Sequence, residues 1–118
     1  MTISTAIAGT FKRFNGDNIE LQKRISSSVT VTEYGGQKFS IAPGSTDISI
    51  RPPGVLPIRT VYIETDNKLN VELTGIRTAS LDLYENGILA IMNASLSDVK
   101  LSNRSATLTC VPFFDLSG

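Results

Sequence analysis

The sequence predicts an all-β protein, an antiparallel β-sandwich, and three observations favour this fold class. Apolar and polar residues alternate with a period of two along most of the chain, which is typical of strands with one buried face. Asn-Gly and Gly-Gly pairs separate these segments and supply the positive φ angles of tight turns. No window shows a convincing helical period. We therefore expect roughly nine or ten short strands in two packed antiparallel sheets.

The clearest strands lie in the second half of the chain. Their inward-facing residues are expected to be Val61 and Ile63, Leu69, Val71 and Leu73, Leu81 and Leu83, Leu89 and Ile91, Val99 and Leu101, and Ala106, Leu108 and Cys110. The alternation predicts six successive strands between residues 61 and 110.

Four turn signals are each interpreted as the connection of a β-hairpin. They are Asn15-Gly16 between 7–14 and 19–25, Gly35-Gly36 between 29–34 and 37–42, Asn86-Gly87 between 79–84 and 88–93, and the longer Asp66-Asn67-Lys68. Asn15-Gly16 and Asn86-Gly87 are the stronger local signals, because Asn-Gly is the preferred pair in two-residue hairpin turns.

A proline-rich run over residues 51–57 interrupts the pattern. Its three prolines lack the N–H that a central strand donates, so it is predicted to be a crossover or hinge. Each side of it has fewer than about 65 residues and would bury little core alone. We expect one domain over residues 1–118. A solenoid is the alternative architecture, but no repeated side-chain signature supports it.

Charge and composition narrow the classes of partner. Eleven basic and eleven acidic residues cancel, so the chain is not expected to bind nucleic acid or an anionic membrane through its net charge. A single cysteine allows no internal disulfide, and no secretion signal or membrane span is recognisable, which suits a soluble protein made in the cytosol.

The two halves of the chain differ in charge. Residues 1–59 carry an excess of three basic residues and residues 60–118 an excess of three acidic ones. If these halves form different faces, identical subunits could meet heterologously; otherwise the charges are dispersed over a solvated surface.

The sequence offers no recognisable catalytic constellation. It has no histidine, which excludes Ser–His and Cys–His catalysis, and Cys110 is interpreted as a small buried hydrophobe. Acidic residues gather at 64–67 and 82–86, where calcium could bind, but their spacing matches no EF-hand loop and turns select the same residues. Phosphate-binding glycine loops are missing. We therefore expect no catalytic residue, metal or cofactor, and a protein that is not an enzyme.

Both ends of the chain carry candidate assembly contacts. Residues 1–11 hold no charge and would make an adhesive edge or arm, with Ile3, Ile7 and Phe11 as contacts, unless they form the first strand of the sandwich itself. Phe113 and Phe114 are expected just past the last strand, where they either dock on a partner or anchor the tail to the domain.

One part of the chain resembles a known class of proteins. The segments Val61–Asp66, Leu69–Gly75, Gly87–Ile91 and Val99–Asn103 resemble the C-terminal half of small virion structural proteins of tailed bacteriophages. In that class an I-E-T-D strand is followed by an N-V-x-L-x-G strand, a short apolar strand and a closing segment rich in Ser, Thr and Asn. Residues 1–50 do not take part in the resemblance.

The resemblance implies a jelly-roll-like sandwich located on the virion after synthesis in the host cytoplasm. It implies a capsid decoration or cement protein whose partners are the major capsid protein or other virion proteins, and which is a homo-oligomer, expected to be a trimer. A neck or tail accessory protein is an alternative within the class. A carbohydrate-binding or receptor-binding sandwich is the rival class, although the chain has no tryptophan and its three tyrosines lie on separate segments.

Overall fold

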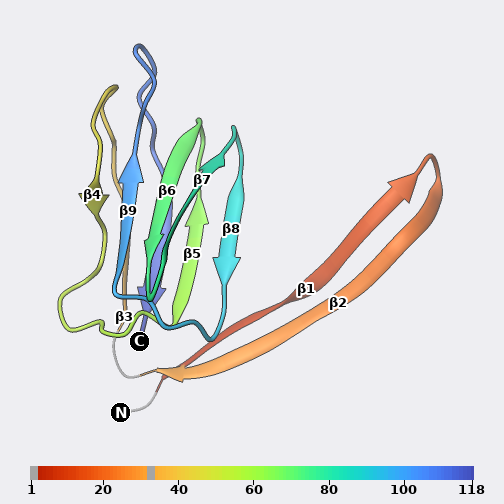
Figure 1. Ribbon diagram of the computed structural model, residues 1–118. Helices are drawn as coiled ribbons and strands as arrows, with labels where there is room; N and C mark the ends of the chain where they lie inside the picture. The colour runs from red at the N-terminus through yellow and green to blue at the C-terminus, as the bar shows by residue number, and fades with distance from the viewer. Residues whose placement is uncertain (1–2, 32–33) are drawn as a thin grey trace.

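The structure is a computed structural model that describes residues 3–31 and 34–118 (Figure 1). These residues form antiparallel strands and no helix, which confirms the all-β prediction. The strands are β1 (Ile3–Asn15), β2 (Asn18–Val31), β3 (Tyr34–Lys38), β4 (Ile48–Ser49), β5 (Thr60–Glu64), β6 (Leu69–Thr74), β7 (Thr78–Leu83), β8 (Ile88–Ile91), β9 (Asp98–Ser102) and β10 (Phe113–Ser117). In the described part of the chain, no helix is long and apolar enough to cross a membrane.

The strands from β3 to β10 form a sandwich of two four-stranded sheets. One sheet, here the β10 sheet, has the order β3-β10-β5-β8, and the other, here the β6 sheet, has the order β4-β9-β6-β7. Apart from β6 and β7, successive strands alternate between the two sheets. This arrangement is a jelly roll and confirms the predicted β-sandwich.

The core lies between the two sheets and is built from alternating residues. Val61, Ile63, Leu69, Val71, Leu83, Val99 and Leu101 are buried there, as predicted. β10 adds Phe114 and Leu116, and the ring of Phe114 meets that of Phe39 edge to face at 5.6 Å between centroids. Leu73, Leu81, Leu89 and Ile91 are half-buried against this cluster.

Only one of the four predicted hairpins exists. Asn15-Gly16 joins β1 to β2, with Gly16 at a φ of +63°. Residues 66–68 and 84–87 are connections, but they lead from one sheet to the other, so the hairpin predictions there are wrong. A tight turn reverses the chain without deciding whether the next strand pairs with the preceding one. A hairpin that was not predicted joins β6 to β7 across residues 75–77.

Gly35 and Gly36 lie inside β3 and form no turn, so that prediction was also wrong. A Cβ on Gly36 would approach the carbonyl oxygen of Phe114 on β10 to 2.6 Å, and one on Gly35 would meet the ring of Pro52 at 2.7 Å. These glycines therefore permit close packing at the edge of the β10 sheet.

The predicted strand over 106–110 is absent. Asn103 is buried and its side-chain amide donates to the carbonyls of Ile41 (2.9 Å) and Leu108 (2.8 Å), which holds this segment as a loop. Only Cys110 makes a bridge, to Ile41. The last strand is β10, so Phe113 and Phe114 lie within a strand and not past it. The proline-rich run 51–57 is a crossover, as predicted, because it leads from β4 to β5 in the opposite sheet.

β1 and β2 pair only with each other and form a long hairpin that projects from one end of the sandwich (Figure 1). We call this hairpin, residues 3–31, the arm. The predicted arm covered residues 1–11, whereas the observed one runs to Val31, because the Asn15-Gly16 turn folds β2 back along the whole length of β1. It is therefore a two-stranded ribbon with all of its ladder hydrogen bonds internal.

Candidate functional site

The arm has one apolar and one polar face. Its register places Phe11 opposite Lys23 and Gly9 opposite Ile25, and residues directly opposite one another in an antiparallel pair share a face. The apolar arm face consists of Ile3, Ile7, Phe11, Leu21, Ile25, Val29 and Val31, with Arg13 and Lys23 at its distal part. The other face carries mainly Ser, Thr, Lys, Arg and Gln side chains with two alanines.

The apolar arm face is covered at its base and uncovered farther out. Val31 is only 1% exposed, and the base is held to the sandwich by a hydrogen bond from the Arg59 guanidinium to the carbonyl of Thr30 (3.2 Å). Phe11, by contrast, is 53% exposed, and Leu21 and Ile25 are exposed as well. The side chains of the apolar arm face are therefore buried at the base of the arm and exposed to solvent toward its tip.

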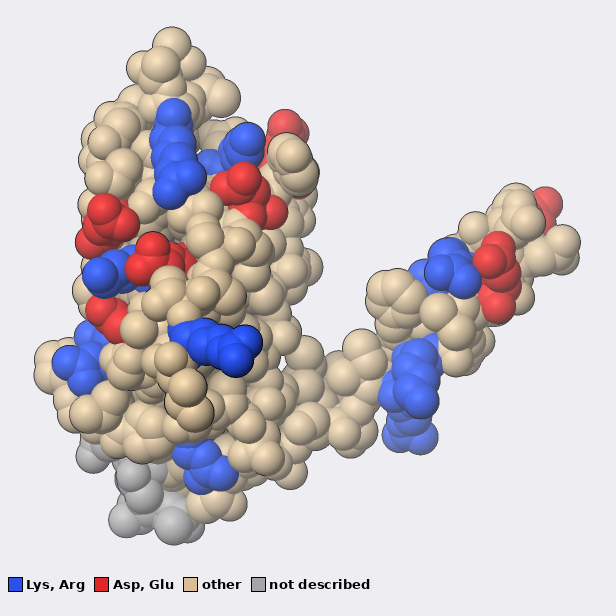
Figure 2. All heavy atoms as spheres, in the orientation of Figure 1, with Lys and Arg blue, Asp and Glu red and all other residues tan. Residues whose placement is uncertain are grey.

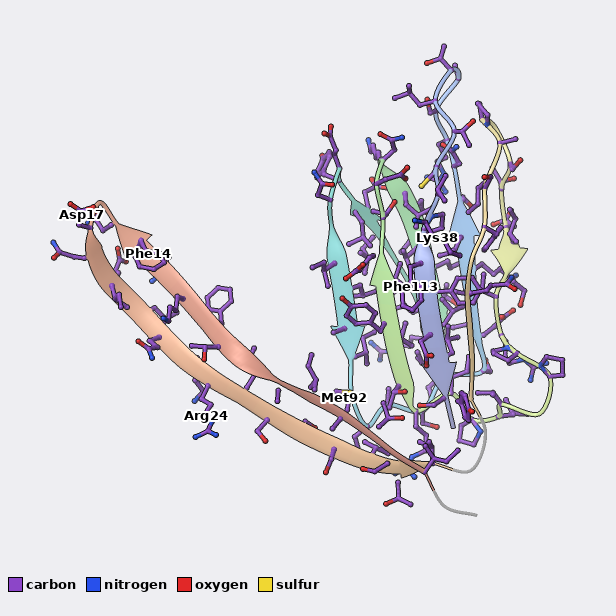
Figure 3. The ribbon with its side chains drawn as sticks, turned by 180° about the vertical axis from the view of Figure 1, so that it is seen from behind. Phe14, Asp17, Arg24, Lys38, Met92 and Phe113 are labelled. Carbon is purple, nitrogen blue, oxygen red and sulfur yellow. The ribbon has the colours of Figure 1, made fainter. Side chains whose placement is uncertain are left out.

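The tip of the arm adds two more exposed apolar side chains. Phe14 lies next to the turn (Figure 3). Ile19 is opposite it in the ladder, and a register shift follows Arg13. Close by, Arg13 and Glu20 form an ion pair at 3.2 Å. Because both side chains are exposed, this ion pair adds little to the free energy of unfolding. It places a carboxylate next to the Arg13 guanidinium.

The outward faces of the two sheets differ in character. On the β6 sheet, alternation and register place polar residues outside: Ser49, Asn70, Glu72, Ser80, Asp82, Lys100 and Ser102. On the β10 sheet they place Phe113, Tyr62, Ile88 and Ala90 outside. The rings of Phe113 and Tyr62 meet edge to face at 6.2 Å between centroids, and Phe113 is still 40% exposed.

Two carboxylates lie on this apolar sheet face. Glu64 accepts a hydrogen bond from the hydroxyl of Tyr62, and this bond is the main cause that raises the pKa of Tyr62. Asp115, directly opposite Tyr62 in the ladder, is half-buried, and burial raises the pKa of its carboxyl. Among the residues that the structure describes, Asp115 makes no ion pair. It is a carboxylate that a cation would stabilise.

A hollow of about 400 Å³ separates the base of the arm from this sheet face. Thr5 and Ile7 line it on the arm side, and Tyr62, Met92 and Phe113 line it on the sandwich side. Figure 3 shows Met92 toward the base of the arm and Phe113 farther along the sheet. The arm and the β10 sheet therefore present their apolar surfaces at the same side of the molecule.

The structure separates the predicted contacts into three places. Ile3, Ile7 and Phe11 lie together on the apolar arm face, and Phe113 lies on the outer face of the β10 sheet. Phe114 points into the core and is 3% exposed, so we no longer count it among the assembly contacts. Its role is the alternative one, anchoring the end of the chain to the domain.

Half of this surface was not predicted from the sequence. Leu21, Lys23 and Ile25 belong to the apolar arm face, and a signal for them existed, because the Asn15-Gly16 turn implies which residues of 19–25 oppose 7–14. Tyr62 and Asp115 had no such signal. They meet only because β10 pairs with β5, across some fifty residues of chain.

Cys110 is buried in the core, as predicted, and burial raises the pKa of its thiol. Within residues 3–31 and 34–118, no group of three or more His, Cys, Asp or Glu side chains is placed to hold a metal ion.

Comparison with known proteins adds information on the fold. No family model and no curated protein matches the chain. A solved structure of oxalate oxidase in complex with the substrate analogue glycolate is similar, with a TM-score of 0.52 and 14% identity. The match covers 72% of this chain and 42% of that one, so this chain spans less than half the length of the oxidase. At this identity the likeness shows a shared fold.

This likeness corrects one expectation from the sequence. We expected a protein that is not an enzyme, yet the similar structure is that of an enzyme, so the architecture is one on which catalysis occurs. The exclusion is therefore withdrawn.

Proposed function

We propose that this chain is an assembly protein that binds other protein surfaces through its apolar arm face, and that it serves on a virion as a capsid decoration or cement protein. The observation that carries the proposal is the uncovered part of that face, with Phe11, Leu21 and Ile25, together with the exposed Phe14 and Ile19 at the tip of the arm.

Exposed apolar side chains scattered singly over a surface need no explanation, but a contiguous patch on a projecting ribbon does. Each half-exposed aromatic or branched side chain gains about 1 kcal/mol or more when water is removed from it. Aromatic side chains are also enriched among the residues that dominate binding free energy at protein interfaces. The arm is therefore suited to bind a protein surface, because the alternation of apolar and polar residues places several apolar side chains on one face of it.

The sandwich is suited to carry such an arm. Its core is continuous across the two sheets, and the base of the arm is tied to it through Arg59 and through the contact between the Thr5 and Ser117 hydroxyls (3.4 Å). Jelly rolls occur in viral capsid proteins as well as in lectins and cupins. The location on a virion rests on the resemblance of roughly residues 60–111 to phage structural proteins.

The proposal is tested by measuring whether the chain co-sediments with virus particles. Particles are purified on a density gradient from cultures of the source of this sequence, and the fractions are probed with an antiserum raised against the recombinant chain. We expect the chain to band with the particles at a constant ratio to their main structural protein. Its presence only in the unsedimented fraction would contradict the proposal.

The role of the arm is tested on the same particles. We expect the recombinant Phe11→Asp variant to stop pelleting with particles that lack the native chain, because a charge replaces a central apolar anchor. The matched control is Thr10→Asp, which places the same charge on the opposite face of the same strand. If both variants pellet as the unmodified chain does, the apolar arm face is not the binding surface.

A further inference from the structure

We propose that the apolar arm face of one copy of this chain seats on the outer face of the β10 sheet of a second copy, with Lys23 of the arm paired with Asp115 of the sheet. This inference rests on the proposed function, in which the arm binds protein, and it names the partner surface. Both surfaces are present on every chain, so the contact needs no other component.

The two surfaces match in their apolar content. The arm offers Phe11, Leu21 and Ile25. The sheet offers Phe113 and Ile88, which lie on either side of Glu64, and the ring of Tyr62 two residues before Glu64 on β5. A sheet of four strands spaced by about 4.8 Å is wide enough to receive a two-stranded ribbon laid across it. The polar outer face of the β6 sheet has no comparable apolar row.

The two surfaces also match in charge. The arm, residues 3–31, carries four basic and two acidic side chains, and Lys and Arg side chains are visible along it in Figure 2. Of the basic residues, only Arg13 and Lys23 belong to the apolar arm face, and Arg13 is paired with Glu20. On the sheet face, Glu64 is bound by Tyr62, whereas Asp115 makes no ion pair in the described part of the chain. Lys23 has no ion pair among the described residues, and Asp115, unlike Glu64, has neither an ion pair nor a side-chain hydrogen bond there; Lys38 on β3 lies diagonally from it in the ladder.

The geometry favours a second copy over the same molecule. The base of the arm already lies beside the sheet of its own chain, and the distal part leads away from the sandwich (Figures 1 and 2). Lys23 lies in this distal part. Its ammonium therefore meets Asp115 of another molecule. Because the arm face and the sheet face are different surfaces, a one-way contact is heterologous and closes as a ring. Two copies that each place their arm on the other's sheet instead form an isologous dimer with two such contacts.

The test measures the mass in solution by size-exclusion chromatography with light scattering, at chain concentrations up to about 100 µM, where even weak association of micromolar affinity is seen. We expect the unmodified chain to exceed the monomer mass. Lys23→Glu and Asp115→Lys are each expected to weaken self-association at least about tenfold, because each places like charges together at the contact. The double variant Lys23→Glu with Asp115→Lys is expected to recover it.

Matched controls separate this pairing from general charge effects and from unfolding. Arg24→Glu makes the same charge change on the polar face of the arm, and Glu85→Lys adds positive charge in the turn between β7 and β8. Both are expected to associate like the unmodified chain. Asp115→Asn is measured as well, because it removes the charge with little change of shape, and circular dichroism melts report whether each variant folds.

A monomeric unmodified chain would overturn the inference, as would a double variant that stays dissociated while both single variants fold. Equal loss in the controls would also overturn it. None of these results depends on the particle gradient: a monomer that still bands with particles would support the proposed function and reject the second copy as the partner of the arm.

Discussion

The arm and the sandwich are built from the same kind of alternating strand, yet they end in different states of burial. In the sandwich, each apolar face meets the face of a second sheet, and Leu116 on β10 is fully buried. In the arm, no second sheet covers the ribbon beyond its base, and Phe11 remains exposed. Alternation therefore specifies that a strand has an apolar face, and the topology decides whether the chain itself covers that face or leaves it to a partner.

The largest expected difference between the two regions comes from deleting a leucine side chain in each. Leu116→Ala should lower the free energy of unfolding by about 2–5 kcal/mol, because it opens a cavity in a closed core. Leu21→Ala on the arm should change it by less than about 0.5 kcal/mol, since its side chain is already exposed. Urea titrations followed by circular dichroism measure both. Similar losses would mean that the arm is part of the cooperative core.

A pair of glycines gives the next largest contrast. Gly36→Ala should destabilise the sandwich by about 1–3 kcal/mol, because its Cβ would meet the Phe114 carbonyl oxygen at 2.6 Å. Gly9→Ala in the arm should be neutral or slightly stabilising, since nothing lies within 4 Å of the added Cβ. Thermal melts of the two variants test this contrast, and a tolerated Gly36→Ala would show that β3 and β10 are less closely packed.

The smallest expected effect is a pH dependence that arises from Asp115. As the pH falls through its pKa, the folded chain should become more stable and its self-association weaker. Tyr62 and Glu64 on β5 and Tyr34 and Lys38 on β3 are the titratable groups around Asp115 on this sheet face. Burial raises the folded pKa of Asp115, so its ionised form opposes folding above that pKa, and this cost disappears as the pH falls through the raised pKa and below the unfolded value. Protonation also removes the partner of Lys23, so self-association should weaken over the same interval.

The variant Asp115→Asn isolates this contribution from the other carboxylates. Compared with it, the unmodified chain should lose relative stability as the pH rises through the pKa of Asp115, and its association should vary with pH while that of the variant does not. Denaturant titrations and light scattering across the acidic range measure the two trends. Identical pH profiles for both proteins would show that Asp115 is not linked to either process.

The sequence predicted local features well and long-range ones poorly, for physical reasons. Residues such as Val61 and Ile63 revealed their strand because alternation within one segment is enough to mark a buried face. Asn86 marked a turn, and it does adopt a φ of 60°, but nothing local indicates that β8 pairs with β5 and not with β7. The alternation around Leu108 predicted a strand, whereas the buried amide of Asn103 holds a loop there.

The candidate site also has a part that could be predicted from local sequence and a part that depends on long-range strand pairing. The arm face could be anticipated in part from the uncharged N-terminal segment and the Asn15-Gly16 turn. The sheet face could not, because Tyr62, Phe113 and Asp115 come together only through the pairing of β5 with β10. Phe113 and Phe114 look equivalent in sequence, and only their position on β10 shows that one faces solvent and the other the core.

The central claim is that the arm of one copy lies on the sheet of another, and cross-linking tests it most directly. Chains labelled with ¹⁴N and ¹⁵N are mixed, allowed to exchange and treated with a carbodiimide, which joins amines to carboxylates in direct contact without a spacer. The account predicts a cross-linked peptide pair that joins Lys23 to Asp115 and includes the mixed-isotope form. A Lys23 to Asp115 product found only within single-isotope chains, or no such product from the assembled protein, would contradict it.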